Sequence, residues 1–155
     1  MIEIRPATAS DLLAICDLQI DSWRSTYRGF VTDQFLDVDV ENILGEHWAE
    51  MPGQRWLVET VWVDNQLGGF IAVESEHSCD AYVDNLHVAD WAQGQGLGRK
   101  LMARAAKAIS AQGNGGLWLT VIADNYGSRA FYRRIGGNEG AEMTQDMFGQ
   151  PVRCL

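Results

Sequence analysis

The spacing of apolar residues predicts that the N-terminal third of the chain is a strand followed by helices. Residues 2–6 alternate as in a short first strand. The apolar residues between Leu12 and Ile20 recur at three- and four-residue steps, which is typical of a helix with one buried face. Residues 40–51 repeat this spacing, and Pro52-Gly53 should end that second helix.

Three strands should follow in the middle of the chain. Residues 55–63 and 67–76 read as a pair joined by a hairpin turn at 64–66. The third strand ends at Val88. Its alternation predicts one face made by Tyr82, Asp84, Leu86 and Val88, and an opposite face made by Val83, Asn85 and His87.

The C-terminal half alternates between helix and strand. A buried stripe between Leu101 and Ile109 predicts a long helix that stops at Gly113, and the nearly continuous apolar run 117–122 predicts a strand buried on both faces. A helix capped by Asn125 and a terminal hairpin of residues 141–147 and 150–154 should complete the fold. No repeat or linker interrupts the 155 residues, so we expect a single α/β domain over residues 1–155. Its single mixed sheet should be mostly antiparallel, with helices on both faces.

A glycine-rich turn lies between the third strand and the following helix. Gly94, Gly96 and Gly98 allow the backbone to turn tightly and to approach a ligand closely. The first turn of a helix carries unpaired N–H groups and positive potential, and Arg99 adds charge beside it. The turn is therefore either an anion site or only a flexible connection. The turn lacks the Lys-Ser/Thr pair that a nucleoside-triphosphate loop requires. It also lacks the third glycine of a dinucleotide-binding loop, so neither kind of nucleotide loop is supported.

Composition narrows the possible partners. The net charge of −9 disfavours nucleic acid and suits a cationic amine, although solubility alone also explains it. No apolar run approaches the roughly 20 residues of a membrane span, so we expect no membrane partner. The three cysteines form no metal or redox pattern, so we expect no metal and a reducing cytoplasm.

The glycine-rich turn resembles a signature of the GNAT acetyltransferase superfamily. Gln93-Gly94-Gln95-Gly96-Leu97-Gly98 matches its Gln/Arg-x-x-Gly-x-Gly pattern, and Leu86-His87-Val88 looks like its acyl-CoA-binding strand. The resemblance implies that residues 93–99 hold the pyrophosphate of coenzyme A. It also implies that the strand diverges from its neighbour and pairs with the pantetheine arm.

A second motif follows the apolar run at 117–122. On a helix that starts near Asn125, Ser128 and Tyr132 are one turn apart and should face the strand ends. The segment is similar to the GNAT pattern Asn-x-x-Ala-x-x-Phe/Tyr-Tyr-x-x-x-Gly-Phe, with Gly137 in place of the final Phe. The resemblance implies that Asn125 and Ser128 contact the coenzyme and that Tyr132 acts as the acid.

Acetyl transfer to an amine also needs a base and a group that polarises the thioester carbonyl. The resemblance gives the polarising role to the backbone N–H of Leu86 or Val88. Asp84 is the candidate base, with Glu74, Glu76 and His77 as rivals. Trp23, Tyr27 and Tyr82 are candidate acceptor-binding residues, although an aromatic stripe like that of Trp23 and Tyr27 also suits a core.

Three functions remain open at this point. The first is an acetyl-CoA-dependent N-acetyltransferase acting on a small or amino-acid-like amine by direct transfer. The second is a protein acetyltransferase acting on an N-terminus or a lysine, for which the short turn at 64–66 gives no sign of a peptide groove. The third is a non-catalytic acyl-CoA-binding module. A terminal hairpin with exposed edges also makes a homodimer possible.

Overall fold

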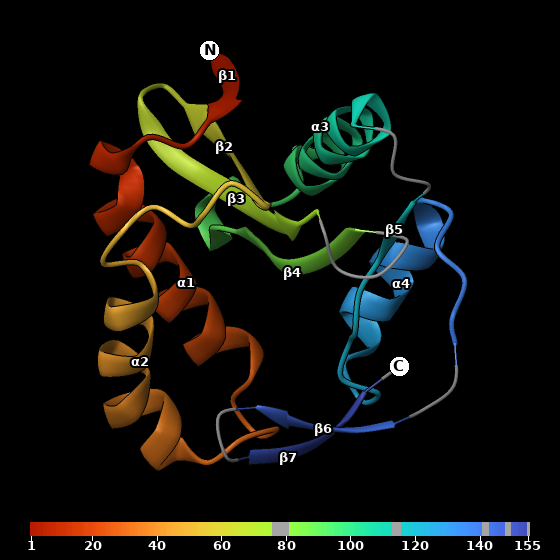
Figure 1. Ribbon diagram of the computed structural model, residues 1–155. Helices are drawn as coiled ribbons and strands as arrows, with labels where there is room; N and C mark the ends of the chain where they lie inside the picture. The colour runs from red at the N-terminus through yellow and green to blue at the C-terminus, as the bar shows by residue number, and fades with distance from the viewer. Residues whose placement is uncertain (76–80, 113–115, 141–142, 148–149, 155) are drawn as a thin grey trace.

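A five-stranded sheet with helices on both faces forms the centre of the computed structural model (Figure 1). The structure describes residues 1–75, 81–112, 116–140, 143–147 and 150–154. The strands are β1 (Ile2–Pro6), β2 (Trp56–Val63), β3 (Gln66–Glu74), β4 (Ala81–Val88), β5 (Leu117–Trp118), β6 (Met143–Met147) and β7 (Gln150–Cys154). The longer helices are α1 (Leu12–Thr26), α2 (Val40–His47), α3 (Leu97–Ala111) and α4 (Tyr126–Arg134). Short helical turns lie at Ala9–Asp11, Phe35–Asp39 and Asp90–Ala92.

The sheet is mixed and mostly antiparallel, as the sequence predicts. Its order is β1-β2-β3-β4-β5, with antiparallel pairing from β1 to β4 and parallel pairing between β4 and β5. The predicted terminal hairpin is confirmed by the antiparallel pair β6 and β7, which forms a separate two-stranded sheet. Its expected turn at 148–149 lies outside the described residues.

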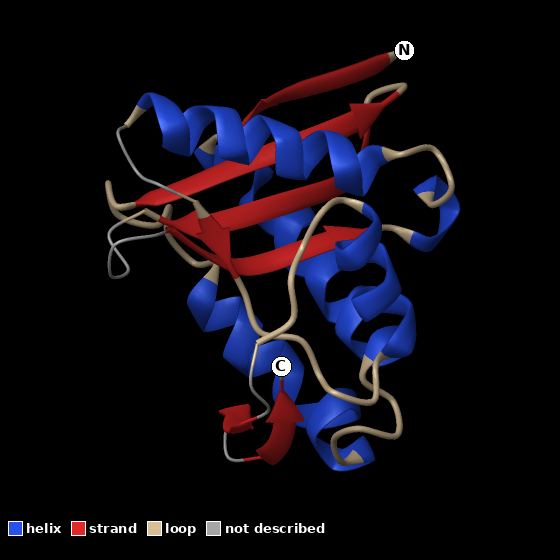
Figure 2. Ribbon diagram, turned by 90° about the vertical axis from the view of Figure 1, so that its right-hand side faces the viewer, coloured by secondary structure: helices blue, strands red, loops and turns tan. Residues whose placement is uncertain are grey.

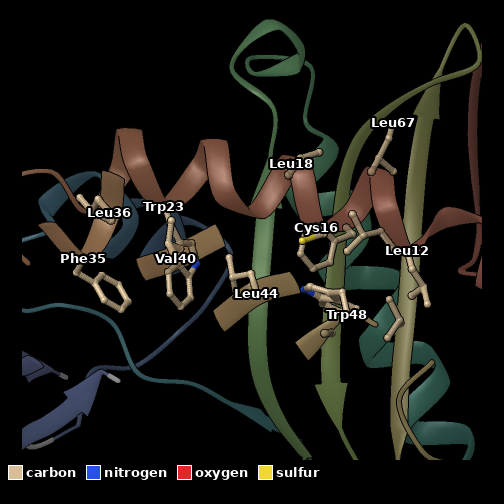
Figure 3. Packing of buried hydrophobic residues seen from close by; sticks show 14 of the residues in the cluster. Leu12, Cys16, Leu18, Trp23, Phe35, Leu36, Val40, Leu44, Trp48 and Leu67 are labelled. Carbon is tan, nitrogen blue, oxygen red and sulfur yellow. The ribbon is translucent and has the colours of Figure 1, made fainter. Parts of the chain in front are cut away.

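The two faces of the sheet carry two separate cores. On one face, α1 and α2 pack against the sheet through a cluster that includes Leu12, Leu44, Trp48 and Phe70 (Figure 3). The other face is covered by α3, which runs along the strands in Figure 2. There Leu101 and its neighbours on α3 meet the valines and isoleucines of β2 and β3. The helices on both faces follow the apolar spacing of the sequence. Each helix buries its apolar stripe against the sheet, which explains the arrangement.

A β-bulge at Asp84 changes which face the end of β4 presents. Ala72 of β3 is opposite Asn85, while the next residue of β3 is opposite Val83, so Asp84 is the extra residue. Val83 packs in the α3 core, whereas Asn85 and His87 bond to side chains of α1. The predicted alternation was therefore wrong across Asp84, because a bulge shifts the two-residue period by one.

The prediction of a long strand over residues 117–122 was also wrong. Regular pairing ends at Trp118, which is exposed, and Leu117 is only half-buried. Leu119 and Val121 line cavities instead of packing between two layers. An apolar run suits a strand packed between two layers and a segment that lines a cavity equally well, because water is excluded from one side of the chain in both.

Candidate active site

A cavity of about 500 Å³ opens between α1, β4, α4 and the segment that follows β5. Many of the residues singled out from the sequence line it, although they come from four parts of the chain. They are Trp23, Tyr27, Tyr82, Asp84, Leu86, His87, Val88, Gln93, Asn125, Ser128 and Tyr132. The fold therefore brings the end of β4 and Gln93, from the first motif, to the same cavity as the second motif.

The glycine-rich turn lies beside this cavity and enters α3. Gly94 and Gly96 have φ values of +81° and +74°, a region that side-chain-bearing residues rarely adopt. Gly96 is the N-cap of α3, so the unpaired N–H groups of the first helical turn follow it directly. Gly94, Gln95, Gly96, Leu97, Gly98 and Arg99 do not line the cavity itself.

Side chains around the turn fix its position against both neighbouring elements. The Gln93 amide donates to the Val88 carbonyl oxygen at 3.3 Å, which ties the turn to the end of β4. A Cβ on Gly98 would lie 3.2 Å from the ring of Phe131, so this glycine allows α4 to approach α3. The Leu97 side chain is buried in the core, which leaves only its backbone for a ligand, whereas the Arg99 side chain is exposed.

The edge of β4 that faces β5 carries two candidate backbone donors. The N–H of Ala89 donates to the Gly68 carbonyl on β3 at 2.8 Å. Because successive N–H groups along a strand alternate in direction, those of Val88 and Leu86 point the other way, toward β5. The pairing of β4 with β5 in the described part of the chain stops at Tyr82 and Trp118. This end of β4 can therefore pair with an extended ligand.

Helix α4 brings a phenol and a helix start to the cavity. The Asn125 side chain caps the helix by accepting a hydrogen bond from the Ser128 N–H at 3.2 Å, as the sequence predicts. Tyr132 follows one turn later, half-buried, with its ring edge-on to Phe131. Burial raises the pKa of Tyr132 to about 12. The phenol therefore keeps its proton at neutral pH and can donate a hydrogen bond.

Aromatic side chains also line the cavity. Trp23 on α1 and Tyr27, which directly follows the helix, pack edge-on with ring centroids 5.6 Å apart. Tyr82 contacts Trp118 with a centroid distance of 4.4 Å, and its hydroxyl lies 3.1 Å from the Thr120 hydroxyl. Trp23 is also buried in the α1 core, so it serves packing and lines the cavity.

The candidate bases differ in where they lie. Asp84 is exposed at the cavity, and one of its oxygens accepts a hydrogen bond from the Asn85 amide at 3.0 Å. Glu74 forms an ion pair with Arg55 at 3.4 Å and does not line the cavity. Glu76 and His77 lie outside the described residues. Among the described carboxylates considered as bases, the geometry favours Asp84.

The His87 side chain faces α1. Trp23 donates its indole N–H to Nε2 of His87 at 3.3 Å, and Nδ1 lies 2.8 Å from the Ser22 hydroxyl. An indole N–H can only donate, so Nε2 accepts and Nδ1 carries the proton. Burial lowers the pKa of His87 to about 4, which keeps the ring neutral. The His87 side chain is thus bonded to α1, and its backbone N–H, by the same alternation along β4, points toward β3 and not toward the edge open to a ligand.

Sequence reasoning missed six polar residues that line the cavity: Gln19, Ser22, Thr26, His47, Asn85 and Thr120. Gln19 is 1% exposed and occupies a position of the apolar stripe of α1. A polar residue at a core position of an amphipathic helix was the signal that could have identified it, because buried amides need partners. The predicted alternation placed Asn85 on the wrong face of β4, because it did not include the bulge at Asp84.

No helix in the described part of the chain combines the length and apolar character that crossing a membrane requires. No three metal-ligating side chains of that part of the chain gather at one point.

Comparisons with known proteins agree with this geometry. The uncharacterised N-acetyltransferase YuaI of Bacillus subtilis is 26% identical over 96% of this chain and 87% of its own length. The streptothricin acetyltransferase of Streptomyces lavendulae is 38% identical over 49% of this chain and 41% of its own length. The PaiA N-acetyltransferase of Thermoplasma acidophilum, solved with coenzyme A, is 20% identical with a TM-score of 0.74, over 99% of this chain and 97% of that one. This likeness shows the shared fold. The model of the acetyltransferase (GNAT) family matches residues 13–137, and the chain belongs to that family.

Proposed function

We propose that the protein is an acetyl-CoA-dependent N-acetyltransferase that moves the acetyl group directly to a primary amine of a small or amino-acid-like acceptor. The observation that carries this proposal is a single cavity lined by the Tyr132 phenol, the Asp84 carboxylate and the free edge of β4. Family membership supports acyl transfer, and the coenzyme A complex of the structural relative supports the donor.

The proposed donor half of the site consists of β4, the glycine-rich turn and the start of α4. The pyrophosphate would bind the N–H groups that follow Gly96, where the helix dipole favours an anion. The pantetheine arm would pair with the edge of β4 at Leu86 and Val88. Asn125 and Ser128 would contact it from α4, since both line the cavity.

The proposed acceptor half consists of α1 and the bulge of β4. Asp84 supplies a negative charge, and Tyr27 and Tyr82 supply aromatic faces that attract a cation. These groups suit an amine, which is cationic before it reacts. The net charge of −9 also favours the approach of a cationic acceptor.

Each residue then has one role in the proposed reaction. Asp84, directly or through water, takes a proton from the amine, whose nitrogen attacks the thioester carbonyl carbon. The N–H of Leu86 or Val88 donates to the carbonyl oxygen as negative charge develops there. The carbon–sulfur bond breaks, the thiolate receives a proton from Tyr132, and the second proton that the nitrogen loses as the amide forms returns through water to the phenolate of Tyr132. Holding the two substrates together supplies much of the acceleration.

The test is a turnover assay with acetyl-CoA and a panel of amines, read by release of free thiol. We expect thiol release with small primary amines and a decrease in kcat of about 10²- to 10⁴-fold for Tyr132→Phe. Tyr126→Phe is the matched control, because Tyr126 is on the same helix but exposed and away from the cavity. Its kcat should equal that of the wild type.

Other outcomes would identify other functions. Tight coenzyme A binding without thiol release would indicate the non-catalytic module, and transfer to peptides alone would indicate a protein acetyltransferase. No affinity for coenzyme A in calorimetry would overturn the proposal. A cytoplasmic location and a homodimer stay predictions from the sequence.

A further inference from the structure

A chain of buried side-chain hydrogen bonds connects α2 to the cavity. The Trp48 indole N–H donates to Oε1 of Gln19 at 2.6 Å. Nε2 of Gln19 donates to Oδ1 of Asn85 at 2.8 Å. Nδ2 of Asn85 then donates to Oδ2 of Asp84 at 3.0 Å. The chain thus runs from the core beneath α1, where Figure 3 shows Trp48, to the carboxylate at the cavity.

The chemistry of the two end groups fixes the direction of the whole chain. An indole N–H can only donate, and an ionised carboxylate can only accept. Between them, each amide of Gln19 and Asn85 has one orientation that satisfies both neighbours. Asp84 therefore receives a donated hydrogen bond from an amide that cannot turn over without breaking the bonds behind it.

The first three members of this chain occupy positions where apolar residues would pack well. Trp48, Gln19 and Asn85 are 3%, 1% and 8% exposed. Burying two amides is unfavourable unless each is hydrogen-bonded, and here the last bond leads out of the core to Asp84. The β-bulge places Asp84 at the cavity, and the Asn85 amide holds its carboxylate there.

We propose that Gln19 and Asn85 are positioning residues that hold the Asp84 carboxylate toward the acceptor amine. This inference rests on the proposed function. A purely structural role for the chain, joining α1, α2 and β4, is the competing explanation. It predicts a loss of stability only, whereas positioning predicts a change in the behaviour of Asp84.

Other titratable side chains share the cavity with Asp84 and must be separated from it. They are Tyr27 directly after α1, His47 at the end of α2, Tyr82 and His87 on β4, and Tyr132 on α4. Histidine is the side chain whose charge normally changes near neutral pH. The pH profiles are therefore recorded in a His47→Gln background, while the bonded and buried His87 is retained.

The main variant is Gln19→Met, which keeps the length of the side chain and removes both hydrogen bonds. We expect kcat to decrease about tenfold and the acidic limb of kcat/KM to move to higher pH by about one unit, because a donated hydrogen bond favours the ionised carboxylate. The affinity for coenzyme A should not change. Adding Gln19→Met to Asp84→Asn should produce no further decrease, since both act through the same carboxylate.

Thr60→Val is the matched control. Thr60 is fully buried on β2 and donates to the Arg5 carbonyl at 2.8 Å, outside the cavity. The Thr60→Val variant should be less stable than the wild type, but its kcat/KM should depend on pH as in the wild type. Trp48→Phe keeps a ring in the core and removes only the first donor, so it serves if Gln19→Met does not fold.

Superimposable pH profiles for Gln19→Met and the wild type, or additive effects in the double variant, would overturn the positioning role. A wild type that shows no transfer would instead contradict the proposed function. A second measurement does not need turnover: the carboxyl carbon of Asp84 is titrated by NMR. Its midpoint should rise in Gln19→Met, and an unchanged midpoint rejects the inference.

Discussion

Each face of the sheet buries one ionisable side chain, His87 of β4 on the α1 face and Glu59 of β2 on the α3 face. The two side chains differ in whether their polar atoms have hydrogen-bond partners. On the α1 face, both ring nitrogens of His87 lie within hydrogen-bonding distance of α1 side chains. On the α3 face, Glu59 is 3% exposed and lies 3.6 Å from Arg104, while its Oε2 atom has no partner in the described part of the chain. The face with satisfied polar groups lines the cavity. The other face is built for apolar packing.

Truncation of the α3 core should have the largest effect on stability. Leu101 is fully buried against β2 and β3, so Leu101→Ala should reduce the free energy of unfolding by about 2–5 kcal/mol. Denaturant titration measures this change. Because Leu101 itself does not line the cavity, kcat of the folded fraction should stay the same. A changed kcat with unchanged stability would break the comparison.

Acid should destabilise the protein through the α1 face. Burial lowers the pKa of His87 from 6.5 to about 4, so its stabilising contribution is complete above pH 6.5 and is lost as the pH falls toward 4. The loss amounts to about 3 kcal/mol. The measurement is the free energy of unfolding as a function of pH. In His87→Met this free energy should change less between pH 6.5 and 4 than it does in the wild type.

A second acid-sensitive pair lies outside this pH window. The Arg5 guanidinium holds the pKa of Asp11 down at about 2, so that contribution is lost only below the ordinary value of 3.8. An equal slope between pH 6.5 and 4 in His87→Met and the wild type would contradict the assignment to His87.

A Cβ added at a glycine of β3 should reduce the stability of the protein by an intermediate amount. At Gly69 it would lie 2.8 Å from the His87 carbonyl oxygen, so Gly69→Ala must push β4 away. We expect a decrease in stability of about 1–3 kcal/mol. The neighbouring Gly68 is the control, because its Cβ would make ordinary contacts at 3.4 Å and beyond. Thermal unfolding of both variants tests this, and equal melting temperatures would show that β4 yields easily.

The smallest effect should come from the unsatisfied carboxylate. Burial raises the pKa of Glu59, so its ionised form opposes folding once the pH exceeds its unfolded value near 4.5. Glu59→Gln should therefore raise the free energy of unfolding by about 1 kcal/mol at pH 7, and the gain should shrink below pH 4.5. Denaturant titration at both pH values measures it. A loss of stability at pH 7 would mean that the pair with Arg104 outweighs burial.

Patterns that depend on neighbours along the chain were predictable from the sequence. The apolar stripes of α1 and α3, the cap at Asn125 and the glycine-rich turn all follow from local spacing. Their convergence on one cavity was available only through the resemblance of two motifs, because spacing alone does not say which strand ends meet.

What the sequence did not provide depends on contacts between distant residues. Gln19 and Asn85 are 66 positions apart, so nothing local indicates their hydrogen bond. The end of β5 at Trp118 was missed because an apolar run has the same composition whether it packs in a sheet or lines a cavity. The roles of the individual site residues stay predictions until the kinetic experiments are done.

The extra residue in β4 can be removed without exchanging the two layers. Val83 and Asn85 pair with consecutive residues of β3, so deletion of Asp84 would leave a regular strand in which the side chains from Asn85 to Val88 keep their sides. Asn85 and His87 would still meet α1, and Leu86 and Val88 would still meet the aliphatic layer. The change would be confined to the loss of one carboxylate from the cavity, so homologues without the bulge should keep the fold and lack this group.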